Sequence, residues 1–308
     1  MTTNPLVSVI IPTYNSAPFI RDCVASIRRN TYASVEIVIV DDGSPDNTLE
    51  IIKSLDTRIT LVEQANAGRG SARNNGVNHA SGEFIAFLDH DDLLEATSIE
   101  ERVQYLAGHP EKGWVFTDAM EYNDQRELGL YLDQFPWLDL RQDQFIQLLR
   151  GIYPLTSTIM VRSPLLKKIG GFNTSINYGD DIELFMRLLL VSEVGMIRKP
   201  LSRRLIHPGQ GVSSTFDRWD SRVGIYRNFR PSVGEMSPAQ KKALAKELKH
   251  SRFKLGECHW EAFDMAEARQ CFLRSLGVNP WAVSALIYTC LSFLPLALLE
   301  YARRARVS

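Results

Sequence analysis

Apolar residues in the first third of the chain form short runs, separated by polar stretches in which apolar residues recur at helical spacing. Each run is rich in β-branched residues and has the length of a buried strand. The runs are VSVIIP (7–12), VEIVIVDDGS (35–44, ending in acids and a turn), ITLVEQ (59–64) and EFIAFLD (83–89). The segments between them predict helices: APFIRDCVASIRRNTY, PDNTLEIIKSL and the glycine-rich GRGSARNNGVNHA.

This alternation predicts an α/β fold with a Rossmann-like, mostly parallel sheet flanked by helices. In such sheets ligands bind beyond the carboxyl ends of the strands. Three polar motifs stand at these ends: Thr13-Tyr14-Asn15, Asp41-Asp42-Gly43-Ser44 and Asp89-His90-Asp91-Asp92. Stability alone does not require such motifs, so we expect them to converge on one crevice.

The rest of the chain is more mixed and then becomes helical. We expect strands over 113–123 and 157–163, and helices over 145–152 and 182–191. From about residue 236 the composition is helical, and Ser237-Pro238 is a good helix start. The stretch AFDMAEARQCFLRSLGVNP resembles half of a tetratricopeptide-type repeat, but a single copy does not support an array. We therefore expect one domain over 1–235 and a helical extension over 236–308.

The end of the extension is unusually apolar. Residues 281–299 carry no charge, and Arg303, Arg304 and Arg306 follow them. The segment approaches a membrane-spanning length, but Pro295 and several hydroxyl residues weaken a simple span. An amphipathic segment lying in the interface, with its arginines against anionic lipid, is the favoured interpretation. Packing against the main domain and a true span remain as alternatives.

Composition excludes several classes of protein. Hydrophobic residues make up 44% and charged residues 23%, and the net charge is −1, so the chain is globular and no nucleic-acid partner is expected. The four cysteines form no CxxC pair, which argues against a zinc site and for buried thiols in a reducing compartment. The N-terminus lacks the basic and apolar regions of a signal peptide, so we expect a cytoplasmic protein.

The motif FLDHDD (87–92) concentrates negative charge behind an apolar strand. Mg²⁺ and Mn²⁺ prefer oxygen ligands, and often share one or two protein carboxylates with substrate phosphates. Asp89 and Asp91 are therefore candidates for a metal that carries a phosphate. The alternative is structural, since Asp91 or Asp92 could cap a helix in the segment LLEATSIEERVQYL.

The second acidic motif and the glycine-rich segment suggest a nucleotide. Asp42 could accept hydrogen bonds from a nucleobase, whereas an Asx-turn that caps the next helix suits Asp46 better. In NAGRGSARNNG, glycines let the backbone approach a phosphate, and Arg69 and Arg73 could neutralise it. A glycine loop alone is weak support.

Taken in order, VSVIIPTYN, VIVDDGSPDNT, NAGRGSARNNG and GEFIAFLDHDD resemble the N-terminal half of family 2 glycosyltransferases. The resemblance covers roughly residues 5–215. It implies a GT-A fold and an inverting enzyme that uses nucleotide-diphospho sugars. It also implies a nucleotide-binding half over about 1–118 and an acceptor half over about 119–235.

The resemblance assigns roles to individual residues. Asp42 looks like the acid that reads a uracil ring, Arg73 lies near the base and phosphates, and Asp89 lies near the ribose. Asp89 and Asp91 match the family's DxD motif, and Asp91 is the more direct metal ligand. The implied nucleotide-binding residues are Pro12, Thr13, Tyr14, Asn15, Asp42, Arg73 and Asp89; the implied metal ligands are Asp91, Asp89 and His207.

An inverting transferase also needs a general base for the acceptor hydroxyl. NYGDDIELFMRL matches the position of the family's acidic pair, which implies Asp181 as the base and Asp180 as a supporting residue. A helix cap is the alternative for both. In RRLIHPGQGVSS, which resembles the family's flexible loop, His207 could reach the metal or the diphosphate, although Leu205 stands where many relatives have arginine.

Four aromatic residues could form a platform on which a sugar stacks. For Trp114 we prefer a place in the core, and Trp137 is left open. The four are Trp114, Trp137, Tyr153 and Tyr178.

The sequence thus predicts a glycosyltransferase that uses Mn²⁺ or Mg²⁺. Its partners would be a nucleotide-sugar donor, UDP-linked, and a glycan or lipid-linked acceptor. It would act in the cytoplasm, peripherally at the inner face of the cell membrane through 281–308. Two alternatives are a nucleotidyltransferase that makes the activated sugar, and a non-catalytic protein that binds a nucleotide sugar or serves as a scaffold.

Overall fold

A computed structural model describes residues 4–55, 58–136, 138–151, 154–207, 214–276 and 281–293. The strands are β1 (Val7–Thr13), β2 (Val35–Asp41), β3 (Ile59–Glu63), β4 (Phe84–Phe87), β5 (Leu93–Leu94), β6 (Lys112–Tyr122), β7 (Glu127–Leu130), β8 (Ile159–Arg162) and β9 (Glu193–Leu205). The helices are α1 (Ile20–Arg28), α2 (Thr48–Lys53), α3 (Arg69–His79), α4 (Ser98–Gly108), α5 (Gln144–Leu149), α6 (Ser163–Ile169), α7 (Asp180–Val191), α8 (Thr215–Asn228), α9 (Pro238–Glu261), α10 (Met265–Ser275) and α11 (Trp281–Leu291). Two short 3₁₀ helices are η1 (Tyr131–Gln134) and η2 (Thr156–Thr158).

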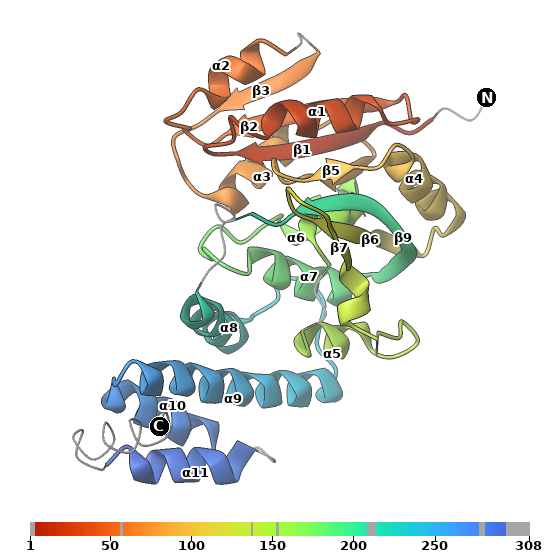
Figure 1. Ribbon diagram of the computed structural model, residues 1–308. Helices are drawn as coiled ribbons and strands as arrows, with labels where there is room; N and C mark the ends of the chain where they lie inside the picture. The colour runs from red at the N-terminus through yellow and green to blue at the C-terminus, as the bar shows by residue number, and fades with distance from the viewer. Residues whose placement is uncertain are drawn as a thin grey trace. The chain divides into compact units, whose positions relative to one another are not determined.

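The described strands form one sheet in the order β3-β2-β1-β4-β8-β6-β9-β5, with β7 beside β6. The pairings among β3, β2, β1 and β4 are parallel, as their intervening helices require. Beyond β4 the sheet is mixed, because β8 runs antiparallel to both β4 and β6 whereas β9 runs parallel to β6. Figure 1 shows β9 as a long strand that curves along β6.

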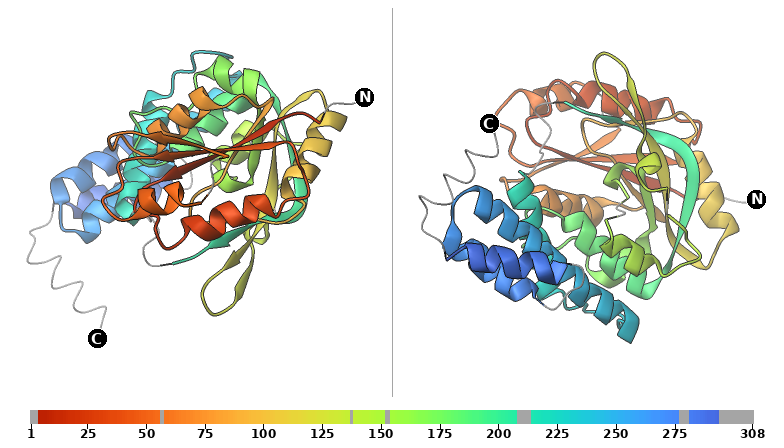
Figure 2. Two further views of the ribbon diagram at one scale, coloured as in Figure 1. Left: turned by 90° about the horizontal axis from the view of Figure 1, so that it is seen from above. Right: turned by 60° about the horizontal axis from the view of Figure 1, so that its bottom comes forward.

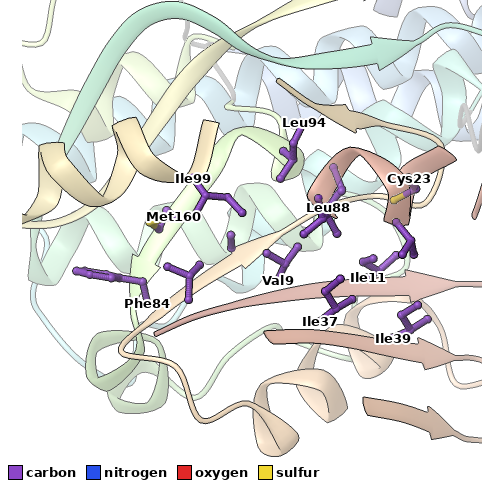
Figure 3. Packing of buried hydrophobic residues seen from close by; sticks show 14 of the residues in the cluster. Val9, Ile11, Cys23, Ile37, Ile39, Phe84, Leu88, Leu94, Ile99 and Met160 are labelled. Carbon is purple, nitrogen blue, oxygen red and sulfur yellow. The ribbon is translucent and has the colours of Figure 1, made fainter. Parts of the chain in front are cut away.

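The main apolar core lies on one face of this sheet. Alternate residues of β1, namely Val7, Val9 and Ile11, contact a cluster that includes residues of α1, α2 and α4. Figure 3 shows Cys23 of α1 and Ile99 of α4 in this cluster, which covers the β1–β2–β4 part of the sheet. Burial of these side chains removes apolar surface from water and fixes the register of the parallel strands.

The opposite face carries α3. Gly76 of α3 lies so close to β1 that a Cβ atom there would stand 2.4 Å from Cγ2 of Ile10. The helix can therefore approach the sheet closely, and its first turn is held beside the carboxyl ends of β1 and β2. This placement matters because α3 begins at Arg69 and carries Arg73.

The apolar runs predicted their elements well. The strands expected over 7–12, 35–44, 59–64, 83–89, 113–123 and 157–163 and the helices expected over 145–152 and 182–191 are present, with shifted ends. The sequence did not predict β5, β7, α8 or β9. The strand β9 has the sequence EVGMIRKPLSRRL, whose lysine, arginines and proline hide a strand that is partly exposed.

Four helices form a separate compact unit. The chain divides into Met1–Gln210 with Pro231–Glu235, and Gly211–Arg230 with Met236–Ser308, so α8 joins α9, α10 and α11. Within this unit α10 packs against α9 and α11, and Figure 2 shows the three helices side by side. Ser237 caps α9 with a capping box, which confirms the predicted helix start.

Two expectations about this part of the chain can be checked. Cys23 and Cys271 are buried as expected, but Cys290 is exposed, so the expectation of buried thiols was wrong for that residue. Among the described residues, no helix has both the length and the apolar character that crossing a bilayer requires. The predicted tail beyond Phe293 lies outside the described residues.

Candidate active site

The carboxyl ends of β1 and β2 lie in register, with Thr13 paired to Asp41. The Thr13 hydroxyl donates to the Val40 carbonyl at 3.2 Å, and Asp41 accepts from the Ser44 hydroxyl at 2.5 Å and the Ser44 amide at 3.1 Å. These bonds form a tight turn after β2. They hold the first two polar motifs side by side, as the sequence predicted.

The next residues of the first motif project outward. Pro12 and Thr13 are buried, whereas Tyr14 is 44% exposed and Asn15 is also exposed. Asn15 adopts a left-handed backbone with φ of 53°, and its amide donates to the Ser44 hydroxyl. Of the four residues predicted to line a nucleotide pocket, Tyr14 and Asn15 therefore present their side chains to solvent.

Asp42 organises the loop that precedes α3. Its two carboxylate oxygens accept from the Ala67 amide at 2.8 Å, the Gly68 amide at 2.9 Å and the Gln64 side chain at 2.7 Å. Gly68 takes φ of 87°, which glycine adopts without strain, and α3 starts at the next residue. Asp42 thus fixes the entry of α3, while its predicted contact with a nucleobase stays a prediction. The Asx-turn expected at Asp46 is present, because Asp46 accepts from the Thr48 amide.

Arg73 joins two distant acids at the centre of the site. Its guanidinium is 1% exposed and donates to Asp89 at 2.6 Å and to Asp180 at 3.1 Å. Arg69, one helical turn earlier, approaches Asp180 at 3.3 Å. Burial opposes the charge on Arg73, but the two carboxylates outweigh it and raise the pKa of the guanidinium. The third motif and the start of α7 are therefore tied to α3 by one buried cation.

Phe172, in the loop before α7, supports this arrangement. The side chain of Asn74 on α3 both accepts from the Phe172 amide and donates to its carbonyl, each at 2.8 Å. The Phe172 ring stacks under the guanidinium of Arg73, 5.1 Å from ring centroid to Cζ. Arg187 of α7 pairs with Glu183 and donates to the carbonyls of residues 169 and 171. The start of this loop is thereby held by both α3 and α7.

The acids of the third motif have separate partners. Burial opposes the charge on Asp89, but the Arg73 guanidinium prevails and lowers the pKa of Asp89. Asp92 is 4% exposed and accepts from the Ser157 hydroxyl at 2.6 Å and from the Leu205 amide at 3.3 Å. Burial, followed by the neighbouring carboxylates of Asp91 and Asp89, raises the pKa of Asp92 well above its ordinary value. The alternative of a helix cap is wrong, since α4 begins only at Ser98.

Asp91 faces the end of β9. Its Oδ2 lies 3.2 Å from Nε2 of His207, and the His207 ring contacts Phe19 with centroids 4.8 Å apart. Both side chains are nearly buried, with exposed fractions of 11% and 14%. An imidazole nitrogen beside a carboxylate oxygen is a donor set that Mn²⁺ or Mg²⁺ accepts when phosphate oxygens complete its shell.

This pair fits a metal that a substrate helps to hold. Among the described residues, no three or more histidine, cysteine or acidic side chains are placed so that they could hold one metal ion together. Asp89 is engaged by Arg73, so its predicted role as a metal ligand stays a prediction. Two protein ligands suit a cation shared with a diphosphate better than a closed structural metal site.

The two acids at the start of α7 differ in their surroundings. Asp180 is 1% exposed and is bound by Arg73 and Arg69. Asp181 is half-buried, and burial followed by the charge of Asp180 raises the pKa of its carboxyl. The N-cap position Gly179 has no side-chain cap, but Asp181 accepts from the Ile182 amide in the first turn of α7 at 2.8 Å, so the helix-cap alternative is wrong for Asp180 and stays open for Asp181. The arrangement can therefore accept a proton at Asp181 while Asp180 stays fixed by arginine.

Sequence reasoning missed the residues that join the strand ends. Ser157 accepts from the Asp89 amide at 3.1 Å and donates to Asp92, and Ser202 of β9 donates to the Ser157 carbonyl. Asp92 thereby connects the third motif with η2, just before β8, and with the end of β9, two residues before His207. The sequence contained a partial signal for this connection, because Asp92 directly follows the DxD motif of Asp89 and Asp91 and had no role assigned to it.

The aromatic residues are not gathered into a platform among the described residues. Trp114 is 1% exposed and stacks on Phe185 with centroids 5.4 Å apart, which confirms its place in the core. Tyr178 is 40% exposed in the loop before α7. Trp137 and Tyr153 lie outside the described residues.

Known proteins share both sequence and fold with this chain. A family model described as glycosyl transferase family 2 matches residues 8–167. An uncharacterized glycosyltransferase of Rickettsia typhi is 31% identical over 230 residues, covering 74% of this chain and 72% of that protein. Chondroitin synthase of Pasteurella multocida is 30% identical over 206 residues, which cover 66% of this chain and 21% of the synthase.

Two solved structures show the fold. S. aureus TarS in complex with UDP-GlcNAc matches with a TM-score of 0.67 and 19% identity, covering 94% of this chain and 89% of that one. The mannosyltransferase PcManGT from Pyrobaculum calidifontis, in complex with GDP-Man and Mn²⁺, matches with a TM-score of 0.62 and 21% identity, covering 99% and 81%. These likenesses confirm the predicted GT-A type of α/β fold.

The connecting role of Asp92 can be tested by stability. Replacing Asp92 with alanine leaves the Leu205 amide and the Ser157 hydroxyl without their acceptor, so we expect the free energy of unfolding to fall by about 2 kcal/mol or more. Asp124 is an exposed acid in the turn between β6 and β7, and its replacement by alanine should cost less than about 0.5 kcal/mol. Chemical denaturation measures both variants, and equal stabilities would contradict the role of Asp92.

Proposed function

The chain belongs to glycosyl transferase family 2, and we propose that it transfers a sugar from a UDP-linked donor to a hydroxyl of a glycan or lipid-linked acceptor. It is an enzyme, a glycosyltransferase of the class that uses nucleotide-sugar donors. The observation that carries the finer proposal is the buried bridge of Arg73 between Asp89 and Asp180. Asp89 is two residues from the proposed metal ligand Asp91, and Asp180 is next to the candidate base Asp181. The bridge therefore places the proposed metal site and the candidate base in one cluster of side chains.

The donor would lie across the carboxyl ends of β1, β2 and β4. Tyr14 and Asn15 are exposed there, and the loop that Asp42 fixes leads into α3. TarS and PcManGT, which have this fold, were solved with UDP-GlcNAc and GDP-Man respectively. We assign the nucleoside to this edge, with Asp42, Arg73 and Asp89 near the base, phosphates and ribose.

Asp91 and His207 would hold Mn²⁺ or Mg²⁺. Their side chains offer one carboxylate and one imidazole within 3.2 Å of each other, and PcManGT was solved with Mn²⁺. Such a cation, when bound, stabilises the negative charge that develops on a departing diphosphate. Asp92, which is next to Asp91, would help keep Asp91 and His207 in place, because its carboxylate accepts from the Leu205 amide at the end of β9 and from Ser157, which itself accepts from the Asp89 amide.

Asp181 would act as the general base in a single displacement. The acceptor oxygen forms a bond to the anomeric carbon as the bond from that carbon to the diphosphate oxygen breaks, so the configuration inverts. The proton of the acceptor hydroxyl passes to the carboxylate of Asp181. Asp180 stays paired with Arg73 and Arg69, and its charge helps keep Asp181 a stronger base.

We further propose that the enzyme works in the cytoplasm at the inner face of the cell membrane. The apolar, arginine-ended sequence of 281–308 supports this placement. A lipid-linked acceptor would be found at the same surface.

Sugar transfer and its dependence on Asp91 and Asp181 test the proposal. Purified protein is incubated with UDP-sugars, and with GDP-mannose for comparison, in the presence of Mn²⁺, and release of the nucleoside diphosphate is measured. We expect release that a chelator abolishes, and a loss of at least about a hundredfold for Asp91→Ala and for Asp181→Ala. Asp124→Ala should keep the wild-type rate.

Three results would contradict this account. One is near-wild-type transfer by both the Asp91 and the Asp181 variants. Another is pyrophosphate release from a nucleoside triphosphate and a sugar phosphate, which would indicate a nucleotidyltransferase. Binding of the nucleotide sugar without transfer or slow donor hydrolysis would indicate a non-catalytic protein.

The pH profile provides a separate test of Asp181. A base must be ionised, so the rate falls as the pH drops through the pKa of Asp181, which burial and then Asp180 raise above the ordinary value of about 4. The nearby Arg69 cation lowers that pKa, so Arg69→Gln should move the acidic limb of kcat/KM to higher pH. Arg141→Gln removes an exposed arginine that pairs with Asp139 and should leave the limb in place. A limb unmoved by Arg69→Gln would exclude Asp181 as the base.

A further inference from the structure

Helix α11 carries apolar side chains on its outer side as well as on its inner side. Toward the rest of the helical unit lie Ala285, Thr289 and, just after the helix, Ser292, which are 0%, 7% and 2% exposed, together with the Tyr288 ring, which stacks on Phe272 with centroids 4.9 Å apart. Leu286 and Ile287, on the opposite side, are 54% and 52% exposed. A helix on the surface of a water-soluble protein normally has polar side chains on that outer side.

The inner side of this segment is engaged with the rest of the helical unit. Thr289 donates to the carbonyl of Ala285, and Ser292 donates to that of Thr289 and accepts from Nε of Arg269 on α10 at 3.1 Å. The packing and polar contacts of the segment are therefore made on its inner side, whereas the large apolar side chains of the outer side are exposed.

The exposed apolar side chains are concentrated at α11. Of the nine large apolar side chains that are exposed in the described part of the chain, four lie between residues 286 and 293. They occupy one side of the segment with the exposed Cys290 among them. The four are Leu286, Ile287, Leu291 and Phe293. We name this set the α11 apolar face.

Positive charge accompanies the α11 apolar face. The guanidinium of Arg269 on α10 lies over the Phe293 ring, with Cζ 3.8 Å from the centroid, and it donates to the Ser292 carbonyl at 2.7 Å. In the sequence, six uncharged residues follow Phe293, then one acid, Glu300, and then Arg303, Arg304 and Arg306. Arginines beside an apolar surface are complementary to anionic lipid headgroups over acyl chains.

We propose that the α11 apolar face is a lipid-binding surface, which inserts into the interface of an anionic membrane with the helix parallel to the bilayer plane. The helix has 11 residues, about half the number that a span requires, so it suits the interface and not a crossing. Insertion moves Leu286 and Ile287 from water into the acyl boundary, and Arg269 beside Phe293 adds positive charge for the headgroups. The proposal rests on the membrane placement proposed above, but not on which reaction the enzyme catalyses.

Sedimentation with lipid vesicles tests this proposal on the full-length protein. We expect the wild type to sediment with vesicles of phosphatidylcholine and phosphatidylglycerol, and less with phosphatidylcholine alone. The double variant Leu286→Glu/Ile287→Glu should bind at least about tenfold more weakly, since each side chain loses the free energy of apolar burial. The control is Leu128→Glu. Leu128 is 44% exposed on β7, in the unit that contains the candidate active site, and this variant should bind vesicles as the wild type does.

The double variant should keep the fold of the wild type, so that a difference in vesicle binding reflects the lost apolar side chains. Both positions are more than half exposed, so circular dichroism and the unfolding transition should be unchanged. Equal vesicle binding by the double variant and the wild type would overturn the proposal. So would a wild type that ignores vesicles but forms a concentration-dependent dimer that the double variant loses, because the face would then bind a second copy of the chain.

Discussion

The site depends on one buried arginine. Arg73 is almost fully buried and contacts an acid from the end of β4 and an acid from the start of α7, which are 91 residues apart in the sequence. Isolated, each of these charges would be costly to remove from water, and together they are tolerated because the guanidinium bonds to both carboxylates. The cation thus holds the segment after β4 and the start of α7 at a fixed separation.

This constraint separates the tasks of five neighbouring acids. Asp89 and Asp180 are committed to Arg73, and Asp92 is committed to Ser157 and the end of β9. Asp91 and Asp181 remain for chemistry, one beside His207 and the other with a raised pKa at the edge of the site. Carboxylates close together normally repel one another, and here each has its own counter-charge or donor.

The sequence predicted the parts of this site that are local. Apolar runs located the parallel strands, and the motifs after them located Asp42, Asp89 and Asp91, because strand ends of one direction meet at one edge. The acidic pair of α7 was located only through the family resemblance. The bridge from Arg73 to Asp180 was not predicted, since it joins residues 107 apart and depends on how closely α3 approaches the sheet. The strand β9 was missed because its exposed face is charged and its apolar pattern is broken.

A double-mutant cycle between Arg73 and Asp180 tests the central claim most directly. Arg73→Met, Asp180→Asn and the double variant are compared with the wild type by the free energy of unfolding. If the buried pair holds α3 and α7 together, the sum of the losses of unfolding free energy in the two single variants will exceed the loss in the double variant by at least about 1.5 kcal/mol. Losses that add to within about 0.5 kcal/mol would show that the two residues act independently, and the account of the site would then be wrong.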